Sequence, residues 1–168
     1  AYAYLNAEDR GVVTVDVTDP GSCGVVNEFI TGEYICALHE YDGHLYAFTL
    51  SKRGYVFDLE TSPSPLAKVD FPTQSMAADV AFQQDYMFVL ASTGKEVSIY
   101  RLPPSYGGGA APEFMNSVDL SGTAGFQHIE VQGDMAYLLN SNLVQLYQIK
   151  PDYTFATCNA LVPSHPVT

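Results

Sequence analysis

A period of about 42 residues is the feature that most constrains the fold of this chain. An aromatic residue recurs in short apolar segments at Tyr4, Tyr46, Phe88 and Tyr137, so that successive aromatics are 42, 42 and 49 positions apart. Self-similarity at such a period indicates a repeat architecture, in which each repeat is one small unit that buries its apolar surface against its neighbours. The repeat therefore predicts a modular fold before any motif is considered.

Each repeat contains β-strand patterns. In the stretch 11–20, Val13, Val15 and Val17 alternate with polar residues, and Asp19-Pro20-Gly21 follows with residues typical of a turn. Weaker copies recur in step, and each repeat holds four short strands without a capped helical pattern. Four strands per 40–45 residues is typical of a β-propeller blade. A β-sandwich is the alternative fold, but it requires no such period.

The predicted fold is thus all-β, with about four propeller blades of four antiparallel strands. The expected blade repeats are residues 1–33, 34–75, 76–125 and 126–162, with 163–168 leading into a further blade. The chain would begin at the second strand of its first blade, so that this blade lacks its inner strand. We therefore expect these residues to belong to a larger propeller or to be completed by another chain, because an open sheet leaves unpaired edges. The extra length of the third repeat predicts a surface loop at 103–112.

The opening motif resembles the LVIVD repeat of surface-type β-propellers. That family pattern, Ala-Tyr-Val followed by Gly-Leu-x-Ile-Val-Asp-Val-Ser-Asp-Pro, is similar to Ala3-Tyr4-Leu5 and the stretch 11–20. The second repeat keeps Asp58 at the matching position, whereas the third has Arg101 and the fourth Gln148. The resemblance implies an extracellular, cell-surface or periplasmic scaffold, and it specifies a fold more than a chemistry.

Composition excludes some classes of function. The formal net charge of −12 makes nucleic-acid binding unfavourable, because phosphates would be repelled. No apolar run approaches the roughly 20 residues of a transmembrane helix, and no secretory signal is present in the sequence. The three cysteines, Cys23, Cys36 and Cys158, lack metal-ligand spacing and leave the redox compartment open.

Alignment of the expected inner strands places Asp79 and His128 in one column, from neighbouring blades. These residues could bind a divalent metal, the only cofactor the sequence suggests, or polarise a substrate at the central channel. The alternative is structural, with Asp79 capping a strand and His128 at a polar rim, because two ligands do not complete a typical site of four. No recognised catalytic motif is present.

Tyrosine is abundant, with 12 residues, and Tyr41, Tyr106 and Tyr153 fall outside the repeat register. We expect these three to be exposed and to offer protein or sugar contacts. Three hypotheses follow. The first is a non-catalytic surface scaffold, adhesion or self-assembly module whose partner is another protein or a copy of itself. The second is a metal-dependent hydrolase with a site at the channel, and the third is a carbohydrate-binding propeller.

Overall fold

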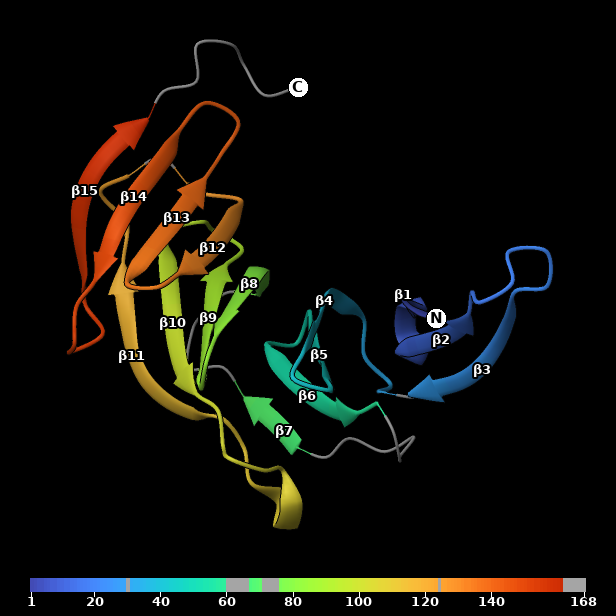
Figure 1. Cartoon of the computed structure of the whole chain (residues 1–168). Coiled ribbons are helices and arrows are strands. Elements are labelled where there is room, and N and C mark those ends of the chain that lie inside the picture. The colour runs from blue at the N-terminus through green and yellow to red at the C-terminus, as the bar shows by residue number, and fades with distance from the viewer. Residues whose placement is uncertain (30, 60–66, 71–75, 124, 162–168) are drawn as a thin grey trace. The chain divides into compact units, whose positions relative to one another are not determined.

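The computed structural model describes residues 1–29, 31–59, 67–70, 76–123 and 125–161 (Figure 1). Within these ranges the regular structure is β-strand apart from two short 3-10 turns, Glu8–Arg10 and Gly107–Gly109. The chain forms two compact units. The first comprises residues 1–76 and 105–111, and the second comprises 77–104 and 112–168.

The first unit holds two antiparallel sheets. The first sheet has three strands in the order β1-β2-β3, and the second has four in the order β4-β5-β6-β7. The strand bounds are β1 Tyr2–Asn6, β2 Val12–Asp16, β3 Gly24–Phe29, β4 Ile35–Tyr41, β5 His44–Thr49, β6 Arg53–Asp58 and β7 Ala67–Asp70.

The second unit holds two four-stranded antiparallel sheets. Their strand orders are β8-β9-β10-β11 and β12-β13-β14-β15. The strand bounds are β8 Ala77–Gln83, β9 Tyr86–Ala91, β10 Glu96–Arg101, β11 Glu113–Asp119, β12 His128–Gln132, β13 Met135–Leu139, β14 Val144–Ile149 and β15 Phe155–Leu161.

Sequential antiparallel strands make each sheet a meander, which is the topology of a propeller blade. Each sheet lies within one of the four repeat ranges that the sequence indicates. The first sheet has three strands, and each of the other three sheets has four among the described residues. The segment 163–168, which the sequence assigns to a further blade, lies outside the described residues.

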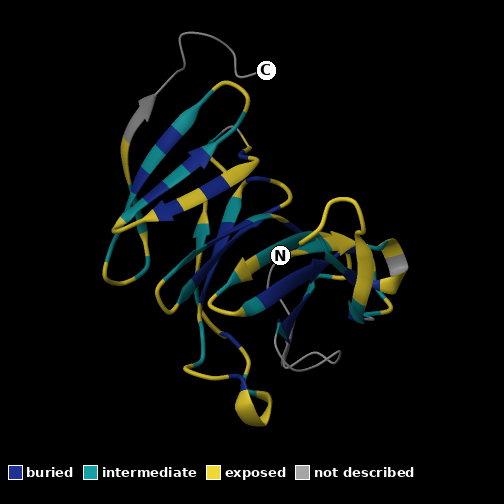
Figure 2. Cartoon of the chain, turned by 45° about the vertical axis from the view of Figure 1, so that its right-hand side comes forward, coloured by how far each residue is buried: buried dark blue, intermediate teal, exposed yellow. Residues whose placement is uncertain are grey.

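The repeat-period aromatics contribute to the interior of the sheets. Tyr46 on β5 and Phe88 on β9 are buried, whereas Tyr4 and Tyr137 are half-buried. Buried residues, dark blue in Figure 2, are concentrated on middle strands such as β5 and β9, because both faces of these strands are covered. In the second unit one apolar cluster joins both sheets and includes Phe88, Ile129 and Leu138.

The loop between β10 and β11 differs from the prediction at one residue. Tyr106 is only 6% exposed, although most neighbouring loop residues are exposed. Its hydroxyl lies 2.9 Å from the Tyr46 hydroxyl, and its ring lies against His44 at 4.9 Å between centroids. The expectation that Tyr106 is an exposed contact residue is therefore wrong, because the loop buries this ring within the first unit.

No helix among the described residues has the length and apolar character needed to cross a membrane.

Candidate functional site

The structure brings Asp79 and His128 together within the second unit. One carboxylate oxygen of Asp79 lies 3.4 Å from His128 Nδ1, and the same oxygen accepts the backbone N–H of Ile129 at 3.0 Å. The other oxygen accepts the N–H of Val80 at 2.9 Å. The Asp79 side chain is mostly buried, whereas that of His128 is 71% exposed. Asp79 therefore links β8 to β12 by one hydrogen bond and accepts a second from its own strand, a structural role that differs from the strand cap considered from the sequence.

This pair does not by itself form a metal centre. In the described part of the chain, no group of three or more His, Cys, Asp or Glu side chains is arranged to hold a metal ion. The Asp79 oxygens are also engaged by backbone donors, which leaves fewer lone pairs for a cation. The Asp79–His128 pair can position β12 against β8, and it would supply two protein ligands to a metal ion.

The other two tyrosines singled out by the sequence lie in different units. Tyr41 ends β4 in the first unit and is half-buried. Tyr153 lies in the turn between β14 and β15 of the second unit, where its hydroxyl contacts that of Tyr86. The two rings are tilted, with centroids 5.0 Å apart. The hydrogen bond to Tyr86, followed by burial, raises the pKa of Tyr153 above its ordinary value.

Tyr153 also lines a cleft of about 460 Å³ in the second unit. Three turns of the two sheets form its walls, at residues 83–86, 133–134 and 148–153, and Phe88 contributes a buried aromatic side chain. The volume falls within the roughly 300–1,000 Å³ range of small-molecule sites. Sequence reasoning missed this cleft, because its turns are distant in the sequence and converge only in the folded chain.

The polar wall of this cleft is a chain of hydrogen bonds. Lys150 Nζ donates to Gln148 Oε1 at 2.9 Å, and Gln148 Nε2 donates to Asp134 Oδ2 at 3.0 Å. A separate amide, that of Gln83, donates from Nε2 to the Gly133 carbonyl at 2.8 Å and so ties the two sheets together. One positive and one negative side chain thus stand on the same wall.

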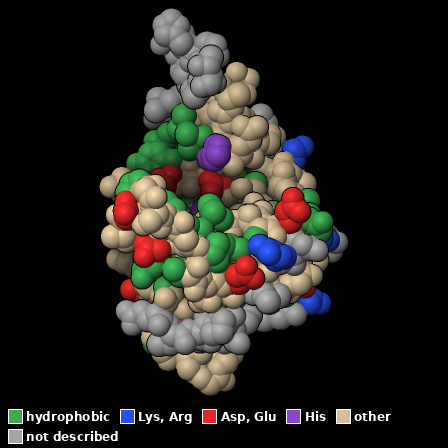
Figure 3. Space-filling model, turned by 90° about the vertical axis from the view of Figure 1, so that its right-hand side faces the viewer, with side chains coloured by type: hydrophobic (Ala, Val, Ile, Leu, Met, Phe, Trp, Pro, Cys, Tyr) green, Lys and Arg blue, Asp and Glu red, His purple; other side chains and the backbone are tan. Residues whose placement is uncertain are grey.

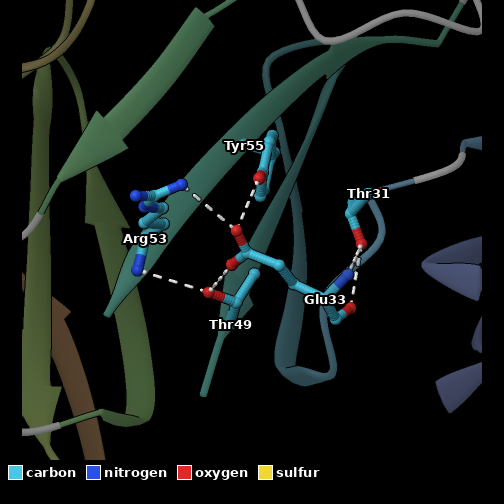
Figure 4. Close-up of polar contacts among 5 residues, drawn as sticks. All are labelled: Thr31, Glu33, Thr49, Arg53 and Tyr55. Atoms are coloured by element: carbon cyan, nitrogen blue, oxygen red, sulfur yellow. Dashed lines mark hydrogen bonds and ion pairs between the residues drawn. The ribbon is translucent and has the colours of Figure 1, made fainter. Parts of the chain in front are cut away.

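A polar cluster in the first unit surrounds Glu33, which lies before β4 (Figure 4). One carboxylate oxygen accepts the Thr49 hydroxyl at 2.8 Å, and the other accepts Tyr55 Oη at 3.2 Å and Arg53 at 3.3 Å. The Thr31 hydroxyl accepts the Glu33 N–H at 3.2 Å. Burial, followed by the Glu33 charge, raises the pKa of Tyr55. This network fixes the entry to β4 and was not identified from the sequence.

The first sheet presents two different faces. Val12 and Phe29 belong to the apolar cluster shared with the second sheet. The opposite face, here called the outer face, carries side chains that the strand register places together: Ala3, Leu5, Val13, Val15 and Val25. Leu5 is 51% and Val25 62% exposed. Figure 3 shows one face of the molecule, on which hydrophobic side chains lie among scattered acidic ones.

The solved structures similar to this chain include a β-propeller domain. The β-propeller domain of Cps50 (Swd1) from Myceliophteria thermophila is 12% identical, with a TM-score of 0.73 over 96% of this chain and 56% of that one. A protein from Lactobacillus plantarum is 13% identical, with a TM-score of 0.74 over 95% and 53%. The computationally designed Ika8 protein is 14% identical, with a TM-score of 0.63 over 95% and 46%.

No family model and no curated protein matches the sequence. The structural likeness defines the class: the chain has a β-propeller fold, as the 42-residue period predicts, and spans about half the length of the structures it is similar to. At these identities the likeness establishes the fold and carries no information on activity.

Proposed function

We propose that this protein is a non-catalytic interaction module of the LVIVD type, which assembles with a second copy of itself through the outer face of its first sheet. The observation that carries the proposal is the exposed apolar surface at Leu5 and Val25, on the face opposite to the one where Val12 and Phe29 pack with the second sheet. Blades of a propeller are covered on both faces, so an apolar outer face calls for another sheet.

The edge strand β1 is a second place where a copy could bind. β1 pairs only with β2 among the described strands. An edge strand can accept a strand from another polypeptide, which supplies backbone hydrogen bonds in addition to apolar contact. The chain covers 56%, 46% and 53% of the three similar structures.

The location proposed for this module is extracellular or at the cell surface. The support is the likeness of residues 11–20 to the LVIVD repeat, together with a strongly acidic composition of 19 Asp and Glu against 7 Lys and Arg. The role is that of a scaffold or adhesion element, in which the contact surface rather than a reaction centre is the functional part.

A matched pair of lysine variants tests the contact surface. Leu5 on the outer face and Leu50 at the end of β5 are both leucines, with exposures of 51% and 49%. Burying a leucine contributes about 1.5–3 kcal/mol, so Leu5→Lys should weaken association by roughly tenfold to a hundredfold. Multi-angle light scattering should then show a smaller mass for Leu5→Lys and the wild-type mass for Leu50→Lys. Equal effects of both variants, or none, would overturn the proposal.

A further inference from the structure

We infer that the cleft between the turns of the second unit binds an uncharged saccharide. This site is separate from the outer face of the first sheet and does not depend on association through it. The cleft, of about 460 Å³, is lined by the aromatic rings of Tyr86, Phe88 and Tyr153 together with side-chain amides. Sugars need this combination, since their C–H faces pack on aromatic rings and their hydroxyls bond to polar groups.

The amides suit hydroxyl groups in particular. Gln83, Gln84 and Gln148 line the cleft, and a glutamine amide both donates and accepts, as does a sugar hydroxyl. Gln83 has a buried Oε1 that makes no hydrogen bond within the described chain. A buried acceptor without a donor is unfavourable, and a ligand hydroxyl that reached this oxygen would satisfy it.

The charges at the wall favour a neutral ligand. Lys150 and Asp134 are bridged by Gln148, so the positive and negative side chains are both engaged and compensate each other. The net charge of −12 disfavours an anionic sugar. Asp134 and Lys150 both line the cleft, so a charged ligand of either sign would meet one like charge as well as one opposite charge.

The turns hold the aromatic and amide side chains at the cleft. Tyr153 and Gln84 have φ of +59° and +51°, and Asp42, in the turn before β5 of the first unit, has φ of +49°, so this left-handed conformation belongs to the turns. The bond from Tyr153 N–H to the Lys150 carbonyl at 2.8 Å closes the turn that carries Tyr153.

Saturation-transfer NMR and calorimetric titration with the neutral disaccharides cellobiose, lactose and diacetylchitobiose test the inference. Glucuronate and glucosamine serve as charged counterparts. Tyr153→Asn removes the ring while keeping a residue that tolerates the left-handed backbone. The matched control is Tyr34→Asn in the first unit, whose ring is 52% exposed and far from this cleft in the chain.

The expected result is binding of at least one neutral disaccharide, weakened about tenfold or more by Tyr153→Asn and unchanged in Tyr34→Asn. If Tyr153→Asn loses its cooperative unfolding transition, Tyr153→Phe takes its place. In that case the binding site is located in the wild type from changes in the amide chemical shifts of residues 83–86 and 148–153 on addition of the sugar. Absence of binding to every neutral sugar, preference for a charged one, or equal weakening in both variants would overturn the inference. Association through the outer face would be unaffected by any of these results.

Discussion

The carboxylate of Asp79 on β8 accepts the backbone N–H of Ile129 on β12 at 3.0 Å and thereby joins two sheets of the second unit. The neighbouring His128 is 71% exposed and adds only a surface contact to the same oxygen. The two residues that the sequence suggested as metal ligands therefore contribute unequally to stability.

Replacement of these residues separates the structural role from a metal-binding role. Asp79→Asn should lower the free energy of unfolding by about 1.5–3 kcal/mol, because a charged acceptor of backbone donors is lost. His128→Ala should change it by about 0.5 kcal/mol or less, as expected for an exposed pair. Urea denaturation with and without a metal chelator measures the free energy of unfolding of both variants. Equal losses in the two variants, or a loss caused by the chelator, would contradict the structural role.

The Glu33 network can be tested with two glutamine variants. Glu33→Gln should cost about 1–3 kcal/mol, because Thr49, whose side chain is buried, and Tyr55 donate to this carboxylate. Glu113→Gln alters the exposed ion pair with Arg101 and should cost about 0.5 kcal/mol or less. Urea unfolding compares the two variants, and similar losses would show that the Glu33 network adds no more than a surface pair.

Glu33→Gln should also shift the titration of Tyr55. Burial is the main cause that raises the pKa of Tyr55, and the Glu33 charge adds to it. Loss of that charge should lower the pKa of Tyr55 toward its ordinary value without restoring it fully. The titration of Tyr55 is followed by the absorbance of tyrosinate, as the difference between each protein and the same protein with Tyr55→Phe. An unchanged Tyr55 titration would contradict the contact drawn in Figure 4.

The buried hydroxyl pair of Tyr46 and Tyr106 predicts that the protein loses stability at alkaline pH. Burial raises the pKa of Tyr46, and burial with the bond to Tyr46 raises that of Tyr106. The unfolded tyrosine therefore loses its proton first, so stability is full below about pH 10 and falls as the pH rises above it. Tyr106→Phe should lower the unfolding free energy by about 1 kcal/mol at neutral pH but reduce the further alkaline loss.

Urea unfolding at about pH 8 and about pH 11 measures this difference. The control is Tyr34→Phe, which alters an exposed ring and should leave the alkaline loss as in the wild type. An identical alkaline loss in Tyr106→Phe and the wild type would contradict the buried hydroxyl pair.

Gly94 and Gly133 give a comparison of backbone strain with steric contact. Both glycines lie in the second unit at positive φ, +67° and +63°. A Cβ at Gly94 would lie 2.2 Å from the Phe126 carbonyl oxygen, whereas one at Gly133 would meet nothing within 4 Å. Gly133→Ala should cost about 1–2 kcal/mol from backbone strain alone. Gly94→Ala should cost about 4 kcal/mol or more, measured by urea unfolding, and equal costs would contradict the close approach.

The sequence predicted the fold because the information lies in its period and in local patterns. The spacing of Tyr4, Tyr46 and Phe88 indicated the repeats, and the alternation around Val13 and Val15 indicated the strands.

The sites were less accessible from the sequence, because they depend on contacts between distant residues. Tyr106 was expected to be exposed, yet it is buried by Tyr46, which lies 60 positions earlier. The cleft is formed by three turns whose glutamines have no pattern of their own. The positive φ of Tyr153 cannot be deduced from a residue type that rarely adopts it.

Sedimentation equilibrium of the wild-type chain over a range of protein and salt concentrations tests whether copies of the chain associate. We expect a mass that rises above 18.3 kDa with protein concentration, and more steeply in high salt. Salt should favour association because it screens the repulsion between copies that each carry a net charge of −12. A mass of 18.3 kDa at every protein and salt concentration would contradict the assembly function proposed here.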